Sequence, residues 1–194
     1  MAATIVCFGE LLLRMSASDN QRLMQLPSLN VHVGGAEANV AISLAQFGHT
    51  SRMVSSLPEN PLADAVIRDL RSHDVQTNSI QRREGRVGLY FLETGAVQRP
   101  SRITYDRAGS SFVETPAATY DWLTLLEDAD WLHISGITPA TGPDAAGAAL
   151  AAARTAVAQG VNVSFDGNYR EQLWKSWSGD SGPIARTRHP RLYQ

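Results

Sequence analysis

The stretch from residue 131 to residue 166 decides the fold, and it reads WLHISGITPATGPDAAGAALAAARTAVAQGVNVSFD. Trp131 to Ser135 is a short apolar run that predicts a buried strand. Pro143 to Gln159 predicts an alanine-rich helix that Gly160 closes, and Val161 to Phe165 predicts the next strand. This order is typical of a parallel sheet that helices cover on both faces. The fold class is therefore α/β.

The same alternation precedes this stretch. Thr4 to Phe8 and Ser51 to Val54 predict strands, and Ala36 to Phe47 predicts a helix that ends at Gly48. Another helix begins at Asn60-Pro61, with Asn as the cap. We expect the apolar faces of these two helices to be Ala36, Val40, Leu44 and Phe47 in the first and Leu62, Val66, Ile67 and Leu70 in the second.

The spacing of apolar residues changes after the second predicted helix, and this change interrupts the alternation of strands and helices. Arg86 to Glu93 and Ser101 to Tyr105 predict two strands joined by a turn around Gly95, which is a hairpin and not a βαβ unit. Leu11 to Met15 and Asn30 to Val33 are two further candidate strands. The hairpin indicates a small additional sheet on top of the main one. Between the hairpin and residue 131, the segment from residue 120 to residue 127 predicts a helix.

Composition excludes several classes of protein. The 194 residues carry a formal net charge of -2, and 43% of them are hydrophobic, which gives no reason to expect nucleic acid or a membrane as partner. The N-terminus lacks the basic start and cleavage site of a secretory signal, so we expect a cytoplasmic protein. Cys7 is the single cysteine, which excludes an internal disulfide, and its apolar neighbours indicate a buried, inert thiol.

Candidate ligand-binding residues follow predicted strands, because open α/β sheets bind ligands beyond the carboxyl ends of their strands. Gly34-Gly35-Ala36-Glu37-Ala38-Asn39 lies just ahead of a helix, where glycines let a ligand approach and free N–H groups can donate. A plain turn is the alternative. The amide of Asn39 favours a site, since a polar group in an apolar segment needs a partner.

A second polar cluster, Asp166-Gly167-Asn168-Tyr169-Arg170, directly follows a predicted strand. Arg170 can clamp a carboxylate or phosphate with two parallel hydrogen bonds, although a solvated loop is an equal alternative. Tyr90 and Tyr105 lie in the hairpin, where a tyrosine is more often a packing residue. The sequence contains no P-loop, no dinucleotide fingerprint and no metal-ligand spacing of histidines, and we interpret His133 as a core residue.

Several segments together resemble the PfkB family of carbohydrate kinases. The first signature of that family resembles Gly34-Gly35-Ala36-Glu37-Ala38-Asn39-Val40-Ala41, with Gly48 at the expected spacing. The segments that follow in the right order are Gly88-Leu89-Tyr90-Phe91, Tyr105-Asp106-Arg107-Ala108-Gly109-Ser110, Leu132-His133-Ile134-Ser135-Gly136-Ile137-Thr138-Pro139 and Asp166-Gly167-Asn168-Tyr169-Arg170. This set looks specifically like 2-keto-3-deoxygluconate kinases, from about Thr4 to about Trp177.

The resemblance implies a ribokinase-like three-layer core with a β-hairpin lid, and it implies roles for the candidate residues. The loop of Gly34, Gly35, Ala36, Glu37, Ala38 and Asn39 would hold the sugar hydroxyls through backbone groups. Tyr90 and Tyr105 would close over the substrate, Arg107 and Arg170 would bind its carboxylate or neighbouring oxygens, and Asn168 would serve the nucleotide side. The reaction would be ATP-dependent and assisted by Mg²⁺. Arg14 stands where ribose and nucleoside kinases tend to place a diol-binding aspartate, which weakens those two readings.

The resemblance also implies that the chain is truncated. The family's second signature, Gly-Ala-Gly-Asp, supplies the catalytic base and lies beyond the end of this sequence, so we expect the chain as given to be inactive. Residues 1–180 would be a partial kinase domain, with lid strands within about 11–33 and 86–106. Residues 181–194 are atypical of the fold and are either a disordered tail or a frameshifted one.

Two alternatives remain open from the sequence. One is another sugar kinase of the same family, such as a fructokinase, which would take a neutral sugar. The other is a non-catalytic sugar-binding or assembly fragment that pairs through its lid. The partners expected for the kinase are a small sugar acid and ATP, with a homodimer through the lid.

Overall fold

The computed structural model describes residues 2–25 and 27–174. Its main sheet has five parallel strands in the order β5-β4-β1-β8-β9. These strands are β1 (Thr4–Phe8), β4 (Thr50–Leu57), β5 (Ile80–Arg82), β8 (Trp131–Ser135) and β9 (Asn162–Asp166). The strands predicted at residues 4–8 and 131–135 have the observed bounds, and the predicted α/β class is confirmed.

The strand order places a crevice beside β1. From β1 the chain goes to β4 and β5 on one side, and later to β8 and β9 on the other side. The carboxyl ends of β1 and β8 therefore lie next to each other where the winding direction changes. Open α/β sheets bind ligands in such a crevice.

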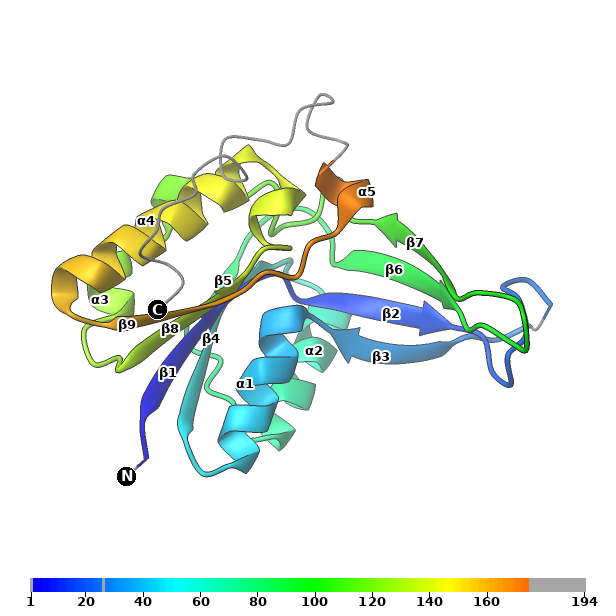
Figure 1. Cartoon of the computed structure of the whole chain (residues 1–194), viewed down its shortest axis with the longest axis horizontal. Helices are drawn as coiled ribbons and strands as arrows, with labels where there is room; N and C mark the ends of the chain where they lie inside the picture. Colours follow the sequence, from blue (N-terminus) through cyan, green and yellow to red (C-terminus); the bar gives the residue numbers. More distant parts are fainter. Residues whose placement is uncertain (1, 26, 175–194) are drawn as a thin grey trace.

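Helices cover both faces of the main sheet, as Figure 1 shows. The helices α1 (Ala36–Gln46) and α2 (Pro61–Ser72) lie on one face, and α3 (Trp122–Leu125) and α4 (Pro143–Gln159) lie on the other. Successive side chains of β1 point to opposite faces of the sheet. Ile5 and Cys7 pack in the first core, under α1 and α2, and Val6 and Phe8 pack in the second core, under α3 and α4. The buried side chains that α4 gives to the second core are alanines, namely Ala145, Ala148, Ala149, Ala152 and Ala156.

The predicted apolar faces of α1 and α2 are wrong in part. The buried residues of α1 are Glu37, Ala38 and Ala41, whereas Phe47 is 79% exposed. Small alanines let the helix backbone lie close to the sheet, and this orientation turns Phe47 outward. In α2, Ala63 takes the place expected for Leu62, which is 56% exposed, because Ala63 completes the i, i+3, i+4, i+7 stripe.

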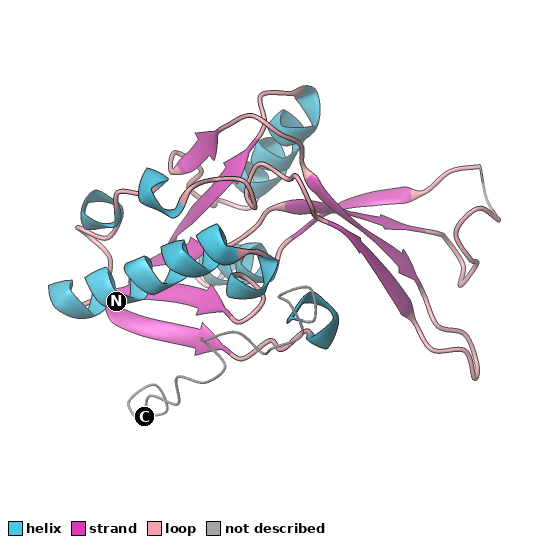
Figure 2. Cartoon of the chain, turned by 90° about the horizontal axis from the view of Figure 1, so that it is seen from above, coloured by secondary structure: helices cyan, strands magenta, loops and turns pink. Residues whose placement is uncertain are grey.

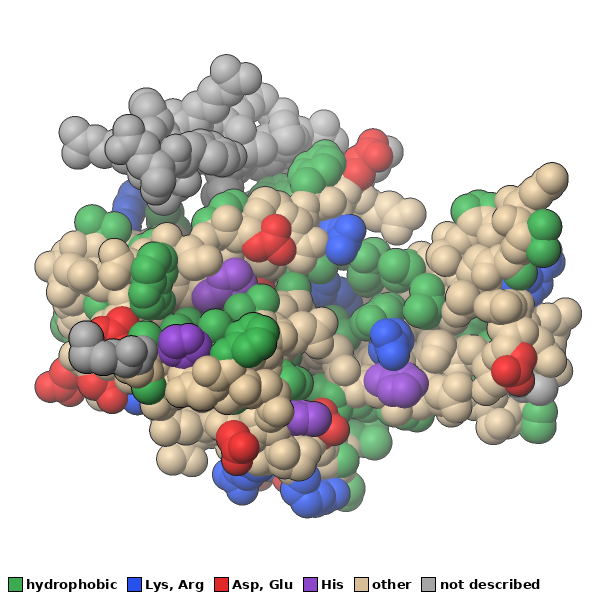
Figure 3. Space-filling view, turned by 60° about the horizontal axis from the view of Figure 1, so that its bottom comes forward, with side chains coloured by type: hydrophobic (Ala, Val, Ile, Leu, Met, Phe, Trp, Pro, Cys, Tyr) green, Lys and Arg blue, Asp and Glu red, His purple; other side chains and the backbone are tan. Residues whose placement is uncertain are grey.

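A second sheet projects from one side of the main body (Figures 1 and 2). Its order is β3-β2-β6-β7, with β2 (Leu12–Ser16), β3 (Asn30–Gly34), β6 (Gly88–Glu93) and β7 (Arg102–Asp106). The predicted hairpin is confirmed, since β6 and β7 pair antiparallel with Tyr90 opposite Tyr105. On the face shown in Figure 3, acidic and basic side chains are intermixed, and the second sheet forms a lobe at one side.

Short elements escaped the sequence analysis because they span too few residues for a period to be visible. They are β5, the short helix α5 (Glu171–Trp174), and the 3₁₀ turns η1 (Ala117–Thr119) and η2 (Pro139–Thr141). The helix expected over residues 120–127 is confined to α3. Predictions for the tail at 181–194 lie outside the described residues. Among the helices of the described part, none has the length and apolar character needed to cross a membrane.

Candidate functional site

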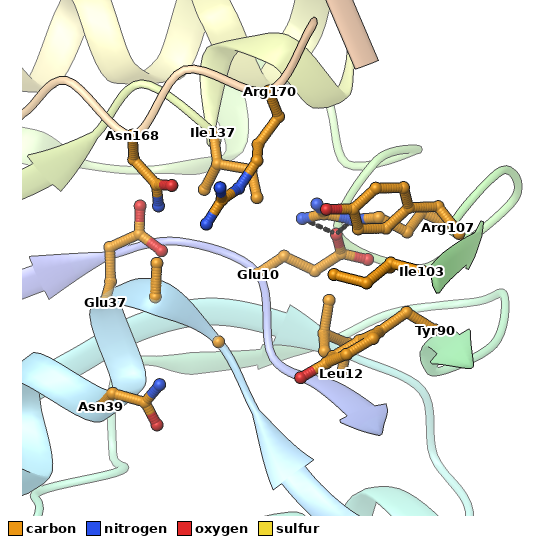
Figure 4. A pocket seen from close by; sticks show the side chains of 13 residues that line it. Glu10, Leu12, Glu37, Asn39, Tyr90, Ile103, Arg107, Ile137, Asn168 and Arg170 are labelled. Carbon is orange, nitrogen blue, oxygen red and sulfur yellow. Dashed lines mark hydrogen bonds and ion pairs between the residues drawn. The ribbon is translucent and has the colours of Figure 1, made fainter. Parts of the chain in front are cut away.

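A pocket lies at the crevice beside β1, between the second sheet and the carboxyl ends of the main strands. Its walls come from the segment after β1, the start of α1, the strands β2, β6 and β7, and the segments after β7, β8 and β9. The lining residues are Glu10, Leu12, Gly35, Ala36, Glu37, Asn39, Tyr90, Ile103, Tyr105, Arg107, Ile137, Asn168 and Arg170. Figure 4 shows them from close by.

Most of the residues predicted from the sequence lie around this pocket, and two do not line it. Ala38 faces the first core and is buried there. Gly34 ends β3, where a Cβ atom would come within 2.9 Å of Cδ1 of Leu12 and 3.3 Å of Cε1 of Tyr90. The contribution of Gly34 is therefore space for these two side chains, which line the pocket.

Glu10 and Arg107 form a buried ion pair in the wall of the pocket. Glu10 is 2% exposed and Arg107 is 7% exposed, and the Nε and one terminal nitrogen of Arg107 contact Oε2 of Glu10. The other carboxylate oxygen of Glu10 accepts a hydrogen bond of 2.7 Å from the hydroxyl of Ser110. A side chain at Gly88 would collide with this carboxylate, so the glycine makes room for it.

The ion pair bears on the role predicted for Arg107. Its Nε and one terminal nitrogen contact one oxygen of Glu10, so a ligand meets an arginine whose charge is already paired. The other terminal nitrogen, Nη1, is buried and has no hydrogen-bond partner among the described residues. A buried donor without a partner is costly, so Nη1 is a donor that a ligand in the pocket can satisfy.

Glu37 anchors the start of α1 to the end of β8. Its Oε1 accepts three hydrogen bonds: 3.0 Å from the backbone N–H of Ser135, 2.7 Å from the Ser135 hydroxyl and 2.7 Å from the Thr138 hydroxyl. The residue is 1% exposed. Burial raises the pKa of Glu37 above its ordinary value, and the hydrogen bonds from Ser135 and Thr138 offset part of that rise. The side chain of Glu37 thus fixes a loop that we expected to act through its backbone alone.

Asn39 lines the pocket, but not for the reason that the sequence suggested. Asn39 is exposed, so its amide can be hydrated and does not need a protein partner. The buried polar group in this segment is Glu37. An acid flanked by alanines in a glycine-led helix start is a signal that could have pointed to Glu37.

The start of α1 offers backbone donors to the pocket. Gly35 occupies the N-cap position with φ of 149°, and no side chain caps the helix. The first N–H groups of a helix have no partner within the helix, and they favour anions and polar oxygens. Gly35 and Ala36 both line the pocket, so these donors can reach a ligand there.

Asn168 and Arg170 reach into the pocket from the segment after β9. In Figure 4 the amide of Asn168 lies beside Glu37, and the guanidinium of Arg170 lies between Glu37 and Glu10. The backbone N–H of Asn168 donates to Asp166 Oδ1 at 3.0 Å, and its φ of 24° turns the chain. The guanidinium of Arg170 forms no ion pair with any of the described residues. Within the described part of the chain, both edges of its guanidinium are therefore open to a ligand.

Tyr90 and Tyr105 stand side by side on the face of the second sheet that meets the pocket. They are directly opposite in the β6–β7 register, and their ring centroids are 6.3 Å apart. Leu12 and Ile103 add apolar surface from the same sheet, and Ile137 adds it from the segment after β8. The lining of the pocket therefore combines cationic and hydroxyl groups with an apolar surface.

Four lining residues were missed by the sequence analysis: Glu10, Leu12, Ile103 and Ile137. Glu10 carried a signal, because an acid directly after a buried strand and before an apolar run needs a partner. The three apolar residues carried none, since nothing in their local pattern separates a pocket wall from a core.

Comparison with known proteins places these features in a family. A family model described as pfkB family carbohydrate kinase matches residues 2–182. A 2-dehydro-3-deoxygalactonokinase from Haloferax volcanii is 34% identical over 174 residues, which cover 90% of this chain and 54% of that protein. The crystal structure of a 2-dehydro-3-deoxygluconokinase from Thermotoga maritima is similar with a TM-score of 0.86 and 46% identity, and the match covers 89% of this chain and 53% of that one.

A fructokinase from Xylella fastidiosa with bound ATP is also similar, with a TM-score of 0.80 and 28% identity over 96% of this chain and 54% of that one. The chain spans about half the length of the curated relatives it matches. The similarity therefore extends through the whole described pocket.

Proposed function

This chain belongs to the pfkB family of carbohydrate kinases, and from that premise we propose that the protein phosphorylates a 2-keto-3-deoxy sugar acid such as 2-keto-3-deoxygluconate. The substrate pocket is the one that Glu37, Tyr90 and Arg170 line. The matched relatives named for 2-dehydro-3-deoxy sugar kinases support this substrate class.

The observation that carries the proposal is that Arg170 and Arg107, whose Nη1 has no partner among the described residues, line the same pocket. A planar guanidinium matches a carboxylate with two parallel hydrogen bonds, which suits an acidic sugar. A neutral sugar would offer no negative charge to Arg170.

The remaining walls suit the rest of a sugar acid. Backbone N–H groups at the start of α1 can donate to hydroxyl or keto oxygens, and the hydroxyls of Tyr90 and Tyr105 can donate or accept. The side chains of Leu12, Ile103 and Ile137 can contact the carbon skeleton. In this arrangement the charged end of the sugar lies at Arg170.

ATP would supply the phosphoryl group, as the fructokinase structure with bound ATP suggests for the family. Asn168 is the described residue that we assign to the nucleotide side. No three His, Cys, Asp or Glu side chains gather in residues 2–25 and 27–174 in a way that could hold a metal ion. We therefore assign no described residue to Mg²⁺ and derive no step through it.

Phosphoryl transfer and sugar recognition are proposed for different portions of the protein. Because the chain spans about half the length of its curated relatives, phosphoryl transfer is proposed for the whole protein and sugar recognition for the described residues. A catalytic base outside this sequence, a homodimer through the second sheet and a cytoplasmic location stay predictions.

Fructokinase is the second candidate, and the similarity to the Xylella fastidiosa enzyme favours it. The test is calorimetric titration of the full chain with 2-keto-3-deoxygluconate and, separately, with fructose. Tighter binding of the acid supports the sugar-acid proposal, whereas tighter binding of fructose replaces it with the second candidate. Binding of the acid with no effect of added ATP would favour a non-catalytic sugar-binding fragment.

A further inference from the structure

The buried ion pair bears on which ligand charge the pocket accepts, and the inference rests on the proposed sugar-acid site. Both carboxylate oxygens of Glu10 are engaged: Oε2 by Arg107 and Oε1 by the hydroxyl of Ser110. Gly88 leaves the space that this carboxylate fills. With Glu10 2% exposed, water does not compete for these bonds. Glu10 is therefore held in one place and acts on the ligand through Arg107.

Arg107 carries little net charge toward a ligand. Its positive charge is compensated by Glu10 at contact distance, and two of its nitrogens are occupied. Opposite charges in contact within a buried wall largely cancel each other's field at a distance. What Arg107 still offers is the unpartnered Nη1, which can donate to a ligand from a fixed position.

Arg170 differs in this respect. Among the described residues no carboxylate forms an ion pair with it, and it points into the same pocket in Figure 4. Glu37, the other acid of the lining, lies beside Asn168, forms no ion pair with Arg170 and receives three hydrogen bonds from neutral donors. Among the described residues, the cationic end of the pocket thus holds two arginines, of which only Arg107 forms an ion pair with a carboxylate.

We infer that Glu10 is a positioning residue that makes this pocket selective for singly charged sugar acids. It directs Nη1 of Arg107 at the ligand and neutralises the second positive charge that a dianion would need. A monoanion is matched by the fork of Arg170 with one additional hydrogen bond from Arg107. A sugar diacid would bring a second carboxylate to a cation that Glu10 already neutralises.

The change Glu10→Gln tests the inference with little change of shape. Glutamine keeps an oxygen that accepts from Arg107 and has an amide that donates to the hydroxyl of Ser110. It removes the negative charge, so Arg107 becomes a full second cation. Removing one unit charge a few ångströms from the ligand should raise the affinity for a dianion relative to a monoanion by about fivefold or more.

The experiment is calorimetric titration of the full chain with gluconate, glucarate and glucose, which carry one, two and no negative charges. Wild type should bind gluconate more tightly than either of the others. E10Q should shift the glucarate-to-gluconate affinity ratio at least about fivefold toward glucarate. The matched control is Glu114→Gln, the same change at an exposed acid of the loop after β7, and it should leave the ratio unchanged.

The double variant Glu10→Gln with Arg107→Gln removes both charges and should return the ratio toward that of wild type. It also provides a folded comparison if the single variant fails to fold. An unchanged ratio in E10Q, or tighter binding of glucarate than of gluconate by wild type, overturns the inference and leaves the proposed function standing. Failure of wild type to bind any sugar acid overturns both.

Discussion

The carboxylate of Glu37 lies where a side chain at Gly9 would stand. A Cβ atom built on Gly9 would collide with both Oε2 and Cδ of Glu37. Gly9 follows β1 and Glu37 lies in the first turn of α1, so the glycine at the end of one strand makes room for the acid that binds the end of another. The pair thus determines how closely α1 approaches β8 at the pocket.

The first prediction concerns Gly9→Ala. The added methyl group forces Glu37 or the start of α1 to move, and overpacking of this kind costs about 1–3 kcal/mol of unfolding free energy. Urea denaturation followed by circular dichroism measures the loss. Gly167→Ala is the matched control, because no atom lies within 4 Å of a Cβ built there. Equal stability of the two variants would contradict the assigned role of Gly9.

The second prediction concerns pH and Glu37. Its pKa in the folded protein is raised above the ordinary value of 4.5, so between 4.5 and the raised value the folded state holds a proton that the unfolded state has released. The contribution of the Glu37 carboxyl to the free energy of unfolding is fully present below pH 4.5. It is lost as pH rises through the pKa of Glu37 in the folded protein. The stability of wild type relative to Glu37→Gln should therefore increase as pH falls through this window.

Urea denaturation of both proteins at several pH values measures this difference. Other acids titrate equally in wild type and E37Q, so their contributions cancel. Glu37→Ala should lose more stability than E37Q at every pH, because it leaves the buried donors of Ser135 and Thr138 without an acceptor. A difference between wild type and E37Q that does not change with pH would show that Glu37 has the same pKa in both states.

The third prediction concerns Arg170→Lys. Lysine keeps the charge and loses the planar fork, so one of two charge-assisted hydrogen bonds to a carboxylate is lost. Such a bond is worth about 1.5–3 kcal/mol, which corresponds to roughly tenfold or greater weakening of sugar-acid binding. Titration with gluconate measures the effect, and Arg68→Lys on the exposed face of α2 is the control. Unchanged affinity would place the carboxylate elsewhere.

The fourth prediction concerns Arg107→Ala, which should destabilise the fold as well as weaken binding. The change leaves Glu10 buried without its cation, and breaking a buried ion pair in this way costs about 3–5 kcal/mol. Adding Glu10→Gln to the same variant should recover part of the loss. Thermal unfolding of the three proteins measures it, and a single variant as stable as wild type would mean that the pair is not formed in solution.

The fifth prediction concerns the thiol of Cys7, the single cysteine of the chain. The side chain is fully buried, and burial raises its pKa to about 12. A thiol reagent at pH 8 should therefore modify the native protein only as fast as it unfolds, and should modify one thiol per chain in denaturant. Rapid modification of the native protein would show that the first core opens locally around β1.

Local pattern was enough to predict the main elements. Short apolar runs gave the strands at 4–8 and 131–135, and helix signals at Pro143 and Gly160 gave the bounds of α4. These signals work because a strand or helix of this kind is specified by neighbours in sequence. The candidate residues at 34–39, 105, 107, 168 and 170 were singled out because they end or follow predicted strands, and Tyr90 because the family resemblance implies a lid. Their roles in binding remain predictions.

The tertiary structure alone decided the chemistry of the pocket. The sequence suggested that Arg107 and Glu37 lie near a ligand, but it could not pair Arg107 with Glu10, 97 residues away, or Glu37 with Ser135, 98 residues away. Nor could it show that α1 turns Ala38 inward and Phe47 outward. Parallel strands bring distant segments together at one edge, so which side chains meet there depends on packing between elements, and no local period records it.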